Sequence, residues 1–368
     1  MSNGDELARH RVERINTHRI DIRYPRQVGL NARLGIHGTG PTVQVREVLT
    51  DLGARGWGVS RTPPEQMPDL CGRRLADLFD PFVGVLAPEA LPLDLPLHDL
   101  AGAILGQPVW RMLGAAGPTS LACYDGAIYM DDLLPEEAPR GVEAVLENCA
   151  ADWGLGYRAF KLKIGRGNKW MPPEEGLQRD ILVTRLVRRH YPDAPILVDA
   201  NDGYTCAGFL RYLDAVAECN LYWVEEPFPE NADDLARLRS FLSQHSPRTL
   251  IADGERDPNI PLLLDLAAQG LLDVLLMDVM GIGLTAWRRW MPAIAELGVW
   301  ASPHAWGDPL KTRYAAQIAA GLGHVATIEG VPGTCAQVDL ERYALIEGEL
   351  HVPDAPGLGL QLLGLEAR

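Results

Sequence analysis

Seven ionisable residues in the second part of the chain follow short apolar segments at regular intervals. They are Lys163, Asp199, Glu225, Glu255, Asp278, His304 and Glu329. From Asp199 onward the successive separations are 26, 30, 23, 26 and 25 residues, which suits one strand plus one helix each. If the apolar segments are parallel strands of one barrel, these side chains meet at the mouth formed by the C-terminal strand ends, where active sites lie.

Asp199, Glu225 and Glu255 place three carboxylates on consecutive predicted strands. Carboxylates this close repel one another strongly unless a cation lies between them. Hard oxygen ligands suit Mg²⁺, and no Cys or His accompanies them, which argues against zinc. The pattern predicts a Mg²⁺ site, and a solvated acidic rim is the alternative.

Two lysines lie within the predicted buried strand "FKLKIG", residues 160–165. Side chains alternate between the faces of a strand, so Lys161 and Lys163 point the same way. A buried ammonium group is costly without compensation. Because adjacent ammonium groups lower each other's pKa, we expect Lys163 to act as a neutral base at about pH 7.

Asp278 and His304 end the sixth and seventh predicted strands, across the barrel from the lysines. Asp278 can accept a hydrogen bond from one imidazole nitrogen, which fixes the tautomer and leaves the other nitrogen for proton transfer. The sequence therefore predicts two acid/base groups on opposite sides of a metal centre.

The elements that must position these residues are eight apolar segments separated by helical patterns. The segments are 121–130, 157–165, 194–201, 221–227, 249–255, 271–279, 297–305 and 324–330. Eight strands alternating with helices favour a parallel (β/α)8 barrel. Upstream, the segments 14–23, 42–51 and 53–60 predict an antiparallel meander, and 93–114 has helical spacing. Residues 115–120 are the best linker candidate.

The bulk properties exclude several classes of protein. The chain has 368 residues and a net charge of -15, which disfavours nucleic acid or an anionic membrane as a partner. Its six cysteines form no CxxC pair, and we expect reduced thiols. The first thirty residues lack the apolar segment of a signal peptide, and no apolar run could span a bilayer. We expect a cytoplasmic protein that acts on a small molecule.

Together, the motifs resemble those of the enolase superfamily, and within it the mandelate racemase subgroup. The matching stretches are "KLK" (161–163), "DAN" (199–201), "WVEEP" (223–227), "GE" (254–255), "MDVMGIGLT" (277–285), "SPH" (302–304) and "IEG" (328–330). The resemblance implies an α/β fold, a modified TIM-type (β/α)8 barrel with an α+β capping domain. It places the cap at 1–118, the barrel at 119–344, and a tail, 345–368, that packs back on the cap.

The same resemblance assigns roles to the convergent residues. Asp199, Glu225 and Glu255 would bind Mg²⁺, which chelates the substrate carboxylate. Lys163 and the His304–Asp278 dyad would be the two acid/base groups. Glu329 would hydrogen-bond the enediolate, and Lys161 would tune Lys163. The resemblance also implies a homo-oligomer.

Substrate selection in this family depends on the cap, whose loop 24–40 reaches the mouth. Candidates for substrate contact are Asn31, Arg33 and His37 in that loop, together with Asn201 and Trp306 on the barrel. Many relatives end the third cap strand in Gly-x-Gly-Glu, whereas this chain has "GWGVS" (56–60). The lengthened segment 165–176 could line the mouth, form an oligomer contact or be a surface insertion.

A lysine and a histidine on opposite faces of one carbon permit two reactions. We expect dehydration of an aldonate or aldarate to a 2-keto-3-deoxy acid, a hydro-lyase reaction. Racemisation or epimerisation of a 2-hydroxy acid is the alternative, and a non-catalytic sugar-acid-binding protein is a further one. Relatives of the muconate-cycloisomerase type and of the dipeptide-epimerase type are disfavoured, because they carry a lysine at the end of the sixth strand, where this chain has Asp278.

Overall fold

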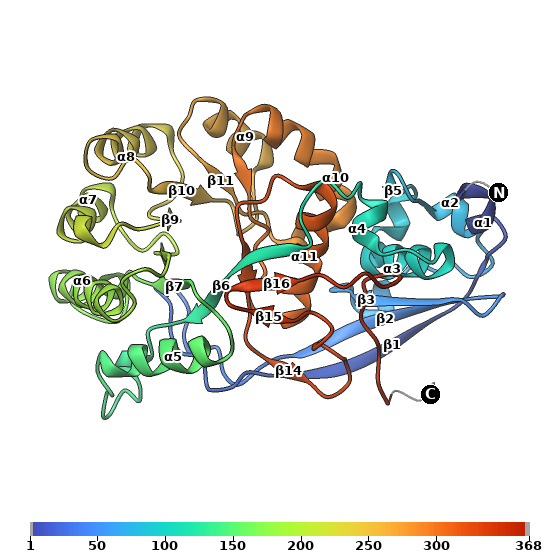
Figure 1. Ribbon diagram of the computed structural model, residues 1–368, viewed down its shortest axis with the longest axis horizontal. Coiled ribbons are helices and arrows are strands. Elements are labelled where there is room, and N and C mark those ends of the chain that lie inside the picture. Colours follow the sequence, from blue (N-terminus) through green and yellow to red (C-terminus); the bar gives the residue numbers. More distant parts are fainter. Residues whose placement is uncertain (1–2, 365–368) are drawn as a thin grey trace.

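The computed structural model describes residues 3–364, which form two regions joined side by side (Figure 1). The smaller region is built on an antiparallel sheet of β1 (Val12–Arg23), β2 (Thr42–Thr50) and β3 (Arg55–Val59), extended at β1 by β14 (Thr334–Cys335). All three segments expected to form the meander are strands. The helices and the hairpin that complete this region are α1 (Asn3–Leu7), α2 (Leu75–Leu78), β4 (Phe79–Asp80), β5 (Gly84–Val85), α3 (Asp94–Leu105) and α4 (Val109–Met112).

The glycines of "GWGVS" allow the close approach of β3 and α3. A Cβ atom on Gly56 would lie 2.2 Å from the backbone nitrogen of Leu100, and one on Gly58 would lie 2.6 Å from Cβ of Leu95. Any larger side chain would push helix and sheet apart. The departure from the Gly-x-Gly-Glu pattern therefore lies beyond the glycines, and the two glycines have a packing role.

The larger region contains eight parallel strands in chain order. They are β6 (Ser120–Ile128), β7 (Phe160–Lys163), β8 (Ile196–Asp199), β9 (Trp223–Glu225), β10 (Leu250–Asp253), β11 (Val274–Leu275), β12 (Trp300–Ala301) and β13 (Ile328–Gly330). β13 pairs with β6, and Ala301 bridges to Val325, so the sheet closes on itself. This confirms the predicted modified (β/α)8 barrel with a capping region.

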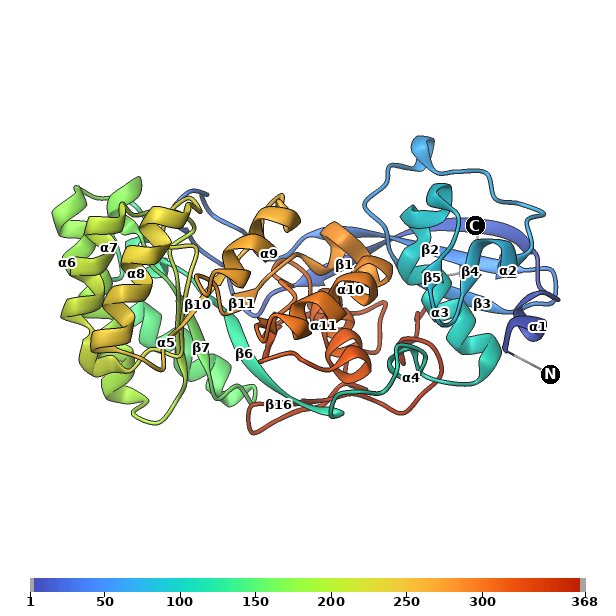
Figure 2. The same cartoon turned by 90° about the horizontal axis from the view of Figure 1, so that it is seen from above.

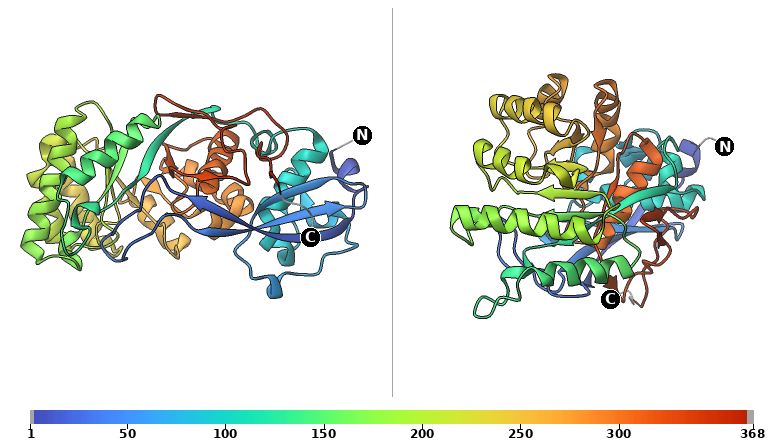
Figure 3. Two further views of the ribbon diagram at one scale, coloured as in Figure 1. Left: turned by 90° about the horizontal axis from the view of Figure 1, so that it is seen from below. Right: turned by 60° about the vertical axis from the view of Figure 1, so that its left-hand side comes forward.

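Helices surround the barrel, as Figure 2 and the right panel of Figure 3 show. They are α5 (Glu143–Gly154), α6 (Pro173–His190), α7 (Cys206–Ala215), α8 (Ala232–His245), α9 (Ile260–Ala268), α10 (Val279–Glu296) and α11 (Pro309–Leu322). Five short 3₁₀ helices lie in the connections: Pro64–Gln66, Pro88–Leu93, Asp131–Leu133, Arg166–Asn168 and Ala217–Cys219. None of the helices in the described part of the chain has both the length and the apolar character needed to cross a membrane. All six cysteines are unpaired.

The C-terminal segment contacts both regions. Its hairpin, β15 (Leu345–Ile346) and β16 (Glu349–His351), pairs through β16 with β6. Beyond the hairpin, the Leu358 amide donates to Asp99 of α3 at 2.7 Å. On this basis we propose a cap of residues 1–118, a barrel of residues 119–344, and a tail of residues 345–368 that packs on the cap. Residues 1–2 and 365–368 lie outside the described part.

Asp308, the N-cap of α11, gives a pH-dependent prediction. Its side chain accepts from the Leu310 amide at 2.8 Å, and burial raises its pKa to about 6 from its usual 3.8. The folded protein then binds this proton more tightly than the unfolded chain, so the contribution of Asp308 to stability falls as the pH rises between these values. Asp308→Asn keeps a good N-cap but does not titrate.

Across that pH window we therefore expect the variant to gain roughly 2–3 kcal/mol of unfolding free energy relative to the wild type. Urea denaturation at a series of pH values measures this difference. Parallel pH profiles for the two proteins would contradict the prediction.

Candidate active site

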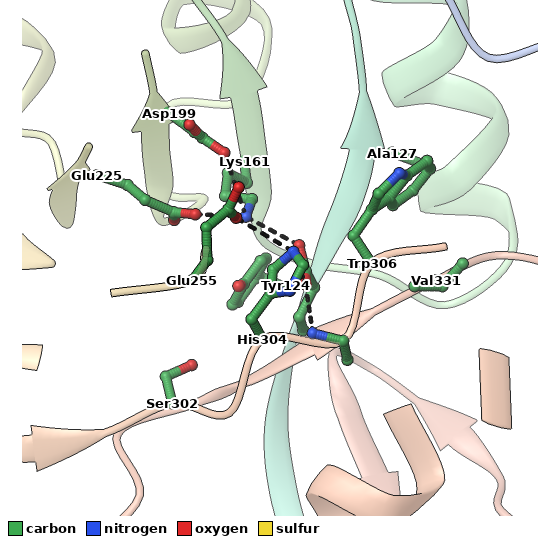
Figure 4. Close-up of polar contacts among 12 residues, drawn as sticks. Tyr124, Ala127, Lys161, Asp199, Glu225, Glu255, Ser302, His304, Trp306 and Val331 are labelled. Atoms are coloured by element: carbon green, nitrogen blue, oxygen red, sulfur yellow. Dashed lines mark hydrogen bonds and ion pairs between the residues drawn. The ribbon is translucent and has the colours of Figure 1, made fainter. Parts of the chain in front are cut away.

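The predicted site residues come from the C-terminal ends of the barrel strands and meet in one region (Figure 4). Lys161 and Lys163 lie in β7, Asp199 ends β8 and Glu225 ends β9. Glu255 follows the end of β10 by two residues. Their side chains converge because parallel strands of a barrel open toward the same mouth.

The three carboxylates form a compact group of oxygen ligands. One oxygen each from Asp199, Glu225 and Glu255 lies within 4.8 Å of the others. Burial, together with Asp199 and Glu255, raises the pKa of Glu225 well above its usual value, although Lys161 opposes this shift. Mutual repulsion of this kind is relieved by a cation.

Two nearby oxygens have no hydrogen-bond donor within residues 3–364. They are Asn201 Oδ1 and Glu255 Oε2, both buried, although Glu255 Oε2 lies 3.1 Å from His304 Nε2. Buried oxygens without donors usually indicate a missing partner such as water or an ion. The all-oxygen donor set and these unsatisfied atoms fit Mg²⁺.

The two lysines lie inside the barrel, and each contacts a carboxylate. Lys161 Nζ is 2.8 Å from Glu225 Oε1 and 2.8 Å from Glu329 Oε1. Lys163 Nζ forms an ion pair with Asp199 Oδ2. Two ammonium groups can be buried on one face of β7 because the surrounding carboxylates compensate their charge.

The pKa of Lys163 differs in direction from the one expected. Burial and the neighbouring Lys161 lower the pKa of Lys163, but Asp199 and other carboxylates raise it, and the net result lies above its usual value. The prediction of a lowered pKa was therefore wrong for the structure as described. Sequence spacing revealed the second lysine but not the direct contact with Asp199.

His304 and Asp278 form the predicted dyad on the opposite side of the barrel. His304 Nδ1 lies 2.9 Å from Asp278 Oδ2, which leaves Nε2 directed at Glu255. Asp278 is the N-cap of α10, since its Oδ1 accepts from the amides of Met280 and Gly281 at 2.9 and 2.8 Å. Asp278 therefore lies at the strand end, as expected, where it forms a parallel bridge with His304, and it also begins α10.

Two further cations contact Asp278. Lys311 Nζ is 2.5 Å from Oδ2, and Arg61 Nη2 is 3.2 Å from Oδ1. Burial raises the pKa of Asp278, but the bond from His304 and the charge of Lys311 lower it further, so it lies well below its usual value. The dyad carboxylate is thus ionised and held from several directions.

Glu329, in β13, lies between the lysine and histidine groups. Its Oε2 accepts from the Ala305 amide at 2.7 Å and is 3.7 Å from His304 Nε2. Burial raises the pKa of Glu329, but Lys161 outweighs this and the pKa is about 2. An ionised carboxylate only accepts hydrogen bonds, whereas bonding to an enediolate needs a donor. The enediolate role stays a prediction.

A cavity of about 350 Å³ opens above this region. It is lined by residues that include Lys163, Glu255, Asp278 and His304 from the barrel, Asn31, His37 and Arg61 from the cap, and Tyr129 and Trp306. Trp306 packs on Tyr129, with ring centroids 4.7 Å apart. The acid/base groups and one carboxylate of the metal triad therefore share a single cavity.

Of the five candidate substrate contacts, Asn31, His37 and Trp306 line the cavity. Arg33 and Asn201 do not. Arg33, in the loop after β1, pairs instead through Nη2 with Oδ2 of Asp202, which follows β8, at 2.8 Å. Asn201 Nδ2 lies 3.3 Å from Glu255 Oε1, so it contacts a ligand of the triad. A substrate contact for Arg33 is not supported by this arrangement.

The lengthened segment after β7 holds the cap loop in place. Three consecutive residues, 168–170, donate to three consecutive carbonyls, 31–33. Asn168 Nδ2 reaches the Ala32 oxygen at 2.9 Å, Lys169 Nζ that of Arg33 at 3.1 Å, and Trp170 Nε1 that of Asn31 at 2.6 Å. The left panel of Figure 3 shows the loop after β1 extending from the cap sheet along the barrel.

Trp170→Phe tests this contact. The variant keeps the ring but loses the donor to Asn31, a bond of about 1 kcal/mol. We expect KM to rise about fivefold at unchanged Mg²⁺ affinity, because the loosened loop lines the cavity but not the triad. Steady-state kinetics and Mg²⁺ titration measure both, and the exposed Trp300→Phe is the control. An unchanged KM would show that the contact does not position the loop.

Several site residues were not predicted. Arg61, Lys311 and Trp170 come from segments far apart in the sequence, and no motif indicates that these three residues reach the site. Lys311 offered a weak signal, since a lysine on the buried side of α11 needs a partner. Tyr129 directly follows β6, so the rule that strand-end residues line the mouth would have identified it.

Comparison with known proteins agrees with this geometry. A family model described as Enolase C-terminal domain-like matches residues 144–365. The chain is 30% identical over 338 residues to the L-Lys-D/L-Arg epimerase of Methylococcus capsulatus, covering 88% of this chain and 84% of that protein. It is 27% identical over 290 residues to the D-galactarolactone cycloisomerase of Agrobacterium fabrum, covering 73% and 70%.

A solved structure is similar over nearly the whole chain. It is galacturonate dehydratase from a Geobacillus species, complexed with D-galacturonate and 5-keto-4-deoxy-D-galacturonate. The TM-score is 0.88 at 32% identity, and the match covers 97% of this chain and 95% of that one. A mutant of that dehydratase is complexed with Mg. The carboxylate triad and the fold of the present chain, together with these matches, show that the chain belongs to the enolase superfamily, in the mandelate racemase group.

Proposed function

We propose that this protein is a Mg²⁺-dependent acid-sugar dehydratase. It would remove the proton α to the substrate carboxylate and eliminate the β-hydroxyl as water. One observation carries the proposal: Lys163 and the His304–Asp278 dyad line the same cavity, beside Glu255 of the carboxylate triad. A dehydratase needs one group to take the α-proton and a second to protonate the leaving hydroxyl.

Asp199, Glu225 and Glu255 would hold the Mg²⁺ ion. When bound, Mg²⁺ would supply positive charge that attracts the substrate carboxylate and offsets the charge of the carboxylates that raise the pKa of Lys163. The residues of the chain then act on protons. Lys163 Nζ and His304 Nε2 would be the two groups that transfer protons, and Asp278 would fix the orientation of His304.

The atoms balance for an α,β-dihydroxy acid. One group takes the α-proton, the C–OH bond at the β-carbon breaks with a proton from the other group, and water leaves. The resulting enol becomes a 2-keto-3-deoxy acid. The 5-keto-4-deoxy-D-galacturonate complexed with the Geobacillus relative has a carbonyl beside a deoxy carbon, the arrangement that this elimination would leave. Hexuronates therefore join aldonates and aldarates as substrate candidates.

Epimerisation is the second candidate, because the same two groups could act on one carbon from opposite faces. The similarity of the chain to the Methylococcus epimerase supports epimerisation as a candidate reaction. Both reactions begin with loss of the α-proton, and only dehydration removes the β-hydroxyl.

A screen of aldonates, aldarates and hexuronates with Mg²⁺ tests the proposal. We expect a keto-deoxy acid from at least one of these acids, detected as its hydrazone. In deuterated buffer the product should carry deuterium at the deoxy carbon, since ketonisation takes a solvent proton. Recovery of an intact hydroxy acid, inverted and deuterated at the α-carbon with no keto acid, would show epimerisation instead. No turnover or exchange of any acid would favour a binding protein.

A further inference from the structure

A second cavity lies where the cap, the barrel and the C-terminal hairpin meet. Its volume is about 240 Å³. β1, β6, α11 and the β15–β16 hairpin all contribute to its wall, and β14 pairs with the end of β1 there (Figure 1). Residues that matter for its chemistry are Arg23, Tyr157, Arg313 and Thr334. None of them lines the cavity above the carboxylate triad.

The charge of this cavity is opposite to that of the protein. The chain has a net charge of -15, yet no Asp or Glu is among the described residues that line this cavity, and two arginines are. Two arginines in a wall that contains no carboxylate make the potential inside this cavity more positive than that of the rest of the surface, which attracts anions.

Neither arginine has a carboxylate partner within residues 3–364. The half-buried Arg313 donates only to carbonyls, from Nη1 to Pro309 at 3.1 Å and from Nη2 to Leu340 at 3.4 Å, and its Nε is buried without an acceptor. Burial lowers the pKa of Arg313, and Asp308, which forms no ion pair with it, offsets this shift only in part. A partly desolvated cation is costly unless an anion pairs with it.

Arg23 is exposed at the end of β1, and its side chain forms no ion pair within the described range. The Tyr157 hydroxyl, a neutral donor, also lacks a partner in that part of the chain. Around one cavity lie an exposed guanidinium without an ion pair, a second guanidinium whose Nε has no acceptor, and a hydroxyl without a partner. This set suits a small oxyanion, since guanidinium binds phosphate and carboxylate with paired N–H groups.

We propose that this cavity binds a small oxyanion, of the phosphate or carboxylate class, between Arg23 and Arg313. The anion would connect the last residue of a cap strand with a barrel helix. Tyr24, next to Arg23, donates to the Gly307 carbonyl at 2.8 Å and stacks on Trp306. Binding would thus stabilise the junction beside the substrate cavity without contacting the substrate.

Inorganic phosphate is the probe, added to the full-length protein without added metal and at constant ionic strength. We expect a saturable rise in Tm of about 3 °C at a concentration ~100 times the Kd. Acetate in a parallel titration distinguishes a carboxylate site from one that needs the higher charge of phosphate. Calorimetric titration gives the Kd directly.

Three variants locate the site. Arg23→Gln and Arg313→Gln should each weaken phosphate binding about tenfold or more, the effect of losing one charged hydrogen-bonding group. Arg19→Gln is the matched control, because Arg19 is also an exposed arginine of β1 but does not line the cavity. Its phosphate affinity should equal that of the wild type.

Each outcome decides the proposal. No rise in Tm with either anion would overturn it, as would an equal rise in the wild type and in Arg23→Gln. If Arg313→Gln fails to fold, Arg23→Gln alone settles the question, since its side chain is exposed and unpaired. None of these readouts uses enzyme turnover, so the result stands apart from the proposed dehydratase activity.

Discussion

Glu255→Gln is expected to weaken Mg²⁺ binding by about 100-fold or more and to abolish measurable turnover. The substitution keeps the shape of the side chain but removes one of three negative charges whose oxygens lie within 4.8 Å of one another. With one charge fewer, the site gains less from a divalent cation and offers a weaker ligand. Isothermal titration with Mg²⁺ measures the affinity, and activity is assayed over a range of Mg²⁺ concentrations.

Asp253→Asn provides the matched control. Asp253 is a buried carboxylate at the end of the same strand, β10, but is not one of the three grouped ligands. Its substitution should leave Mg²⁺ affinity within about twofold of the wild type. Full turnover of the wild type after exhaustive chelation, or unchanged Mg²⁺ affinity in Glu255→Gln, would exclude the triad as the metal site.

The second large effect concerns the two proton-transfer groups. Lys163→Ala and His304→Asn should each reduce turnover by about 10²–10⁴-fold, the range for loss of general acid/base catalysis. Both variants should still bind Mg²⁺, since neither residue is a ligand, and Lys163→Ala should bind it at least as tightly as the wild type because it removes a cation paired with Asp199. A loss of less than tenfold for either variant would remove that residue from the proposed chemistry.

Isotope exchange separates the duties of the two residues. In a dehydratase the groups are unequal, so one variant should still exchange the α-proton with solvent deuterium while releasing little keto product. The other should lose both exchange and product. Which variant retains exchange depends on the configuration of the substrate at the α-carbon. If neither variant releases product from any acid while the wild type only inverts the α-carbon, the reaction is epimerisation.

The sequence by itself determined the barrel and the convergence of its ionisable residues. The regular separations from Asp199 to Glu329 follow the repeat of strand and helix, and parallel strands direct their C-terminal ends to one mouth. The chemistry of a carboxylate triad follows from residue type, so Mg²⁺ could also be predicted. These inferences depend on local periodicity, which the chain displays directly.

Only the tertiary structure decided how the charges are paired. Lys163 contacts Asp199, which raises its pKa instead of leaving it lowered by Lys161. Asp278 proved to be a helix N-cap that also contacts Arg61 and Lys311. Electrostatic energies change steeply over a few ångströms, and sequence spacing does not fix distances on that scale.

The cap loop shows the same limit for neutral contacts. The sequence showed that segment 165–176 is long, but not that residues 168–170 donate to the carbonyls of 31–33. It offered Arg33 as a candidate for substrate contact, but it did not show that Arg33 pairs with Asp202. Contacts between segments more than a hundred residues apart depend on how the cap docks on the barrel, and no local pattern records that docking.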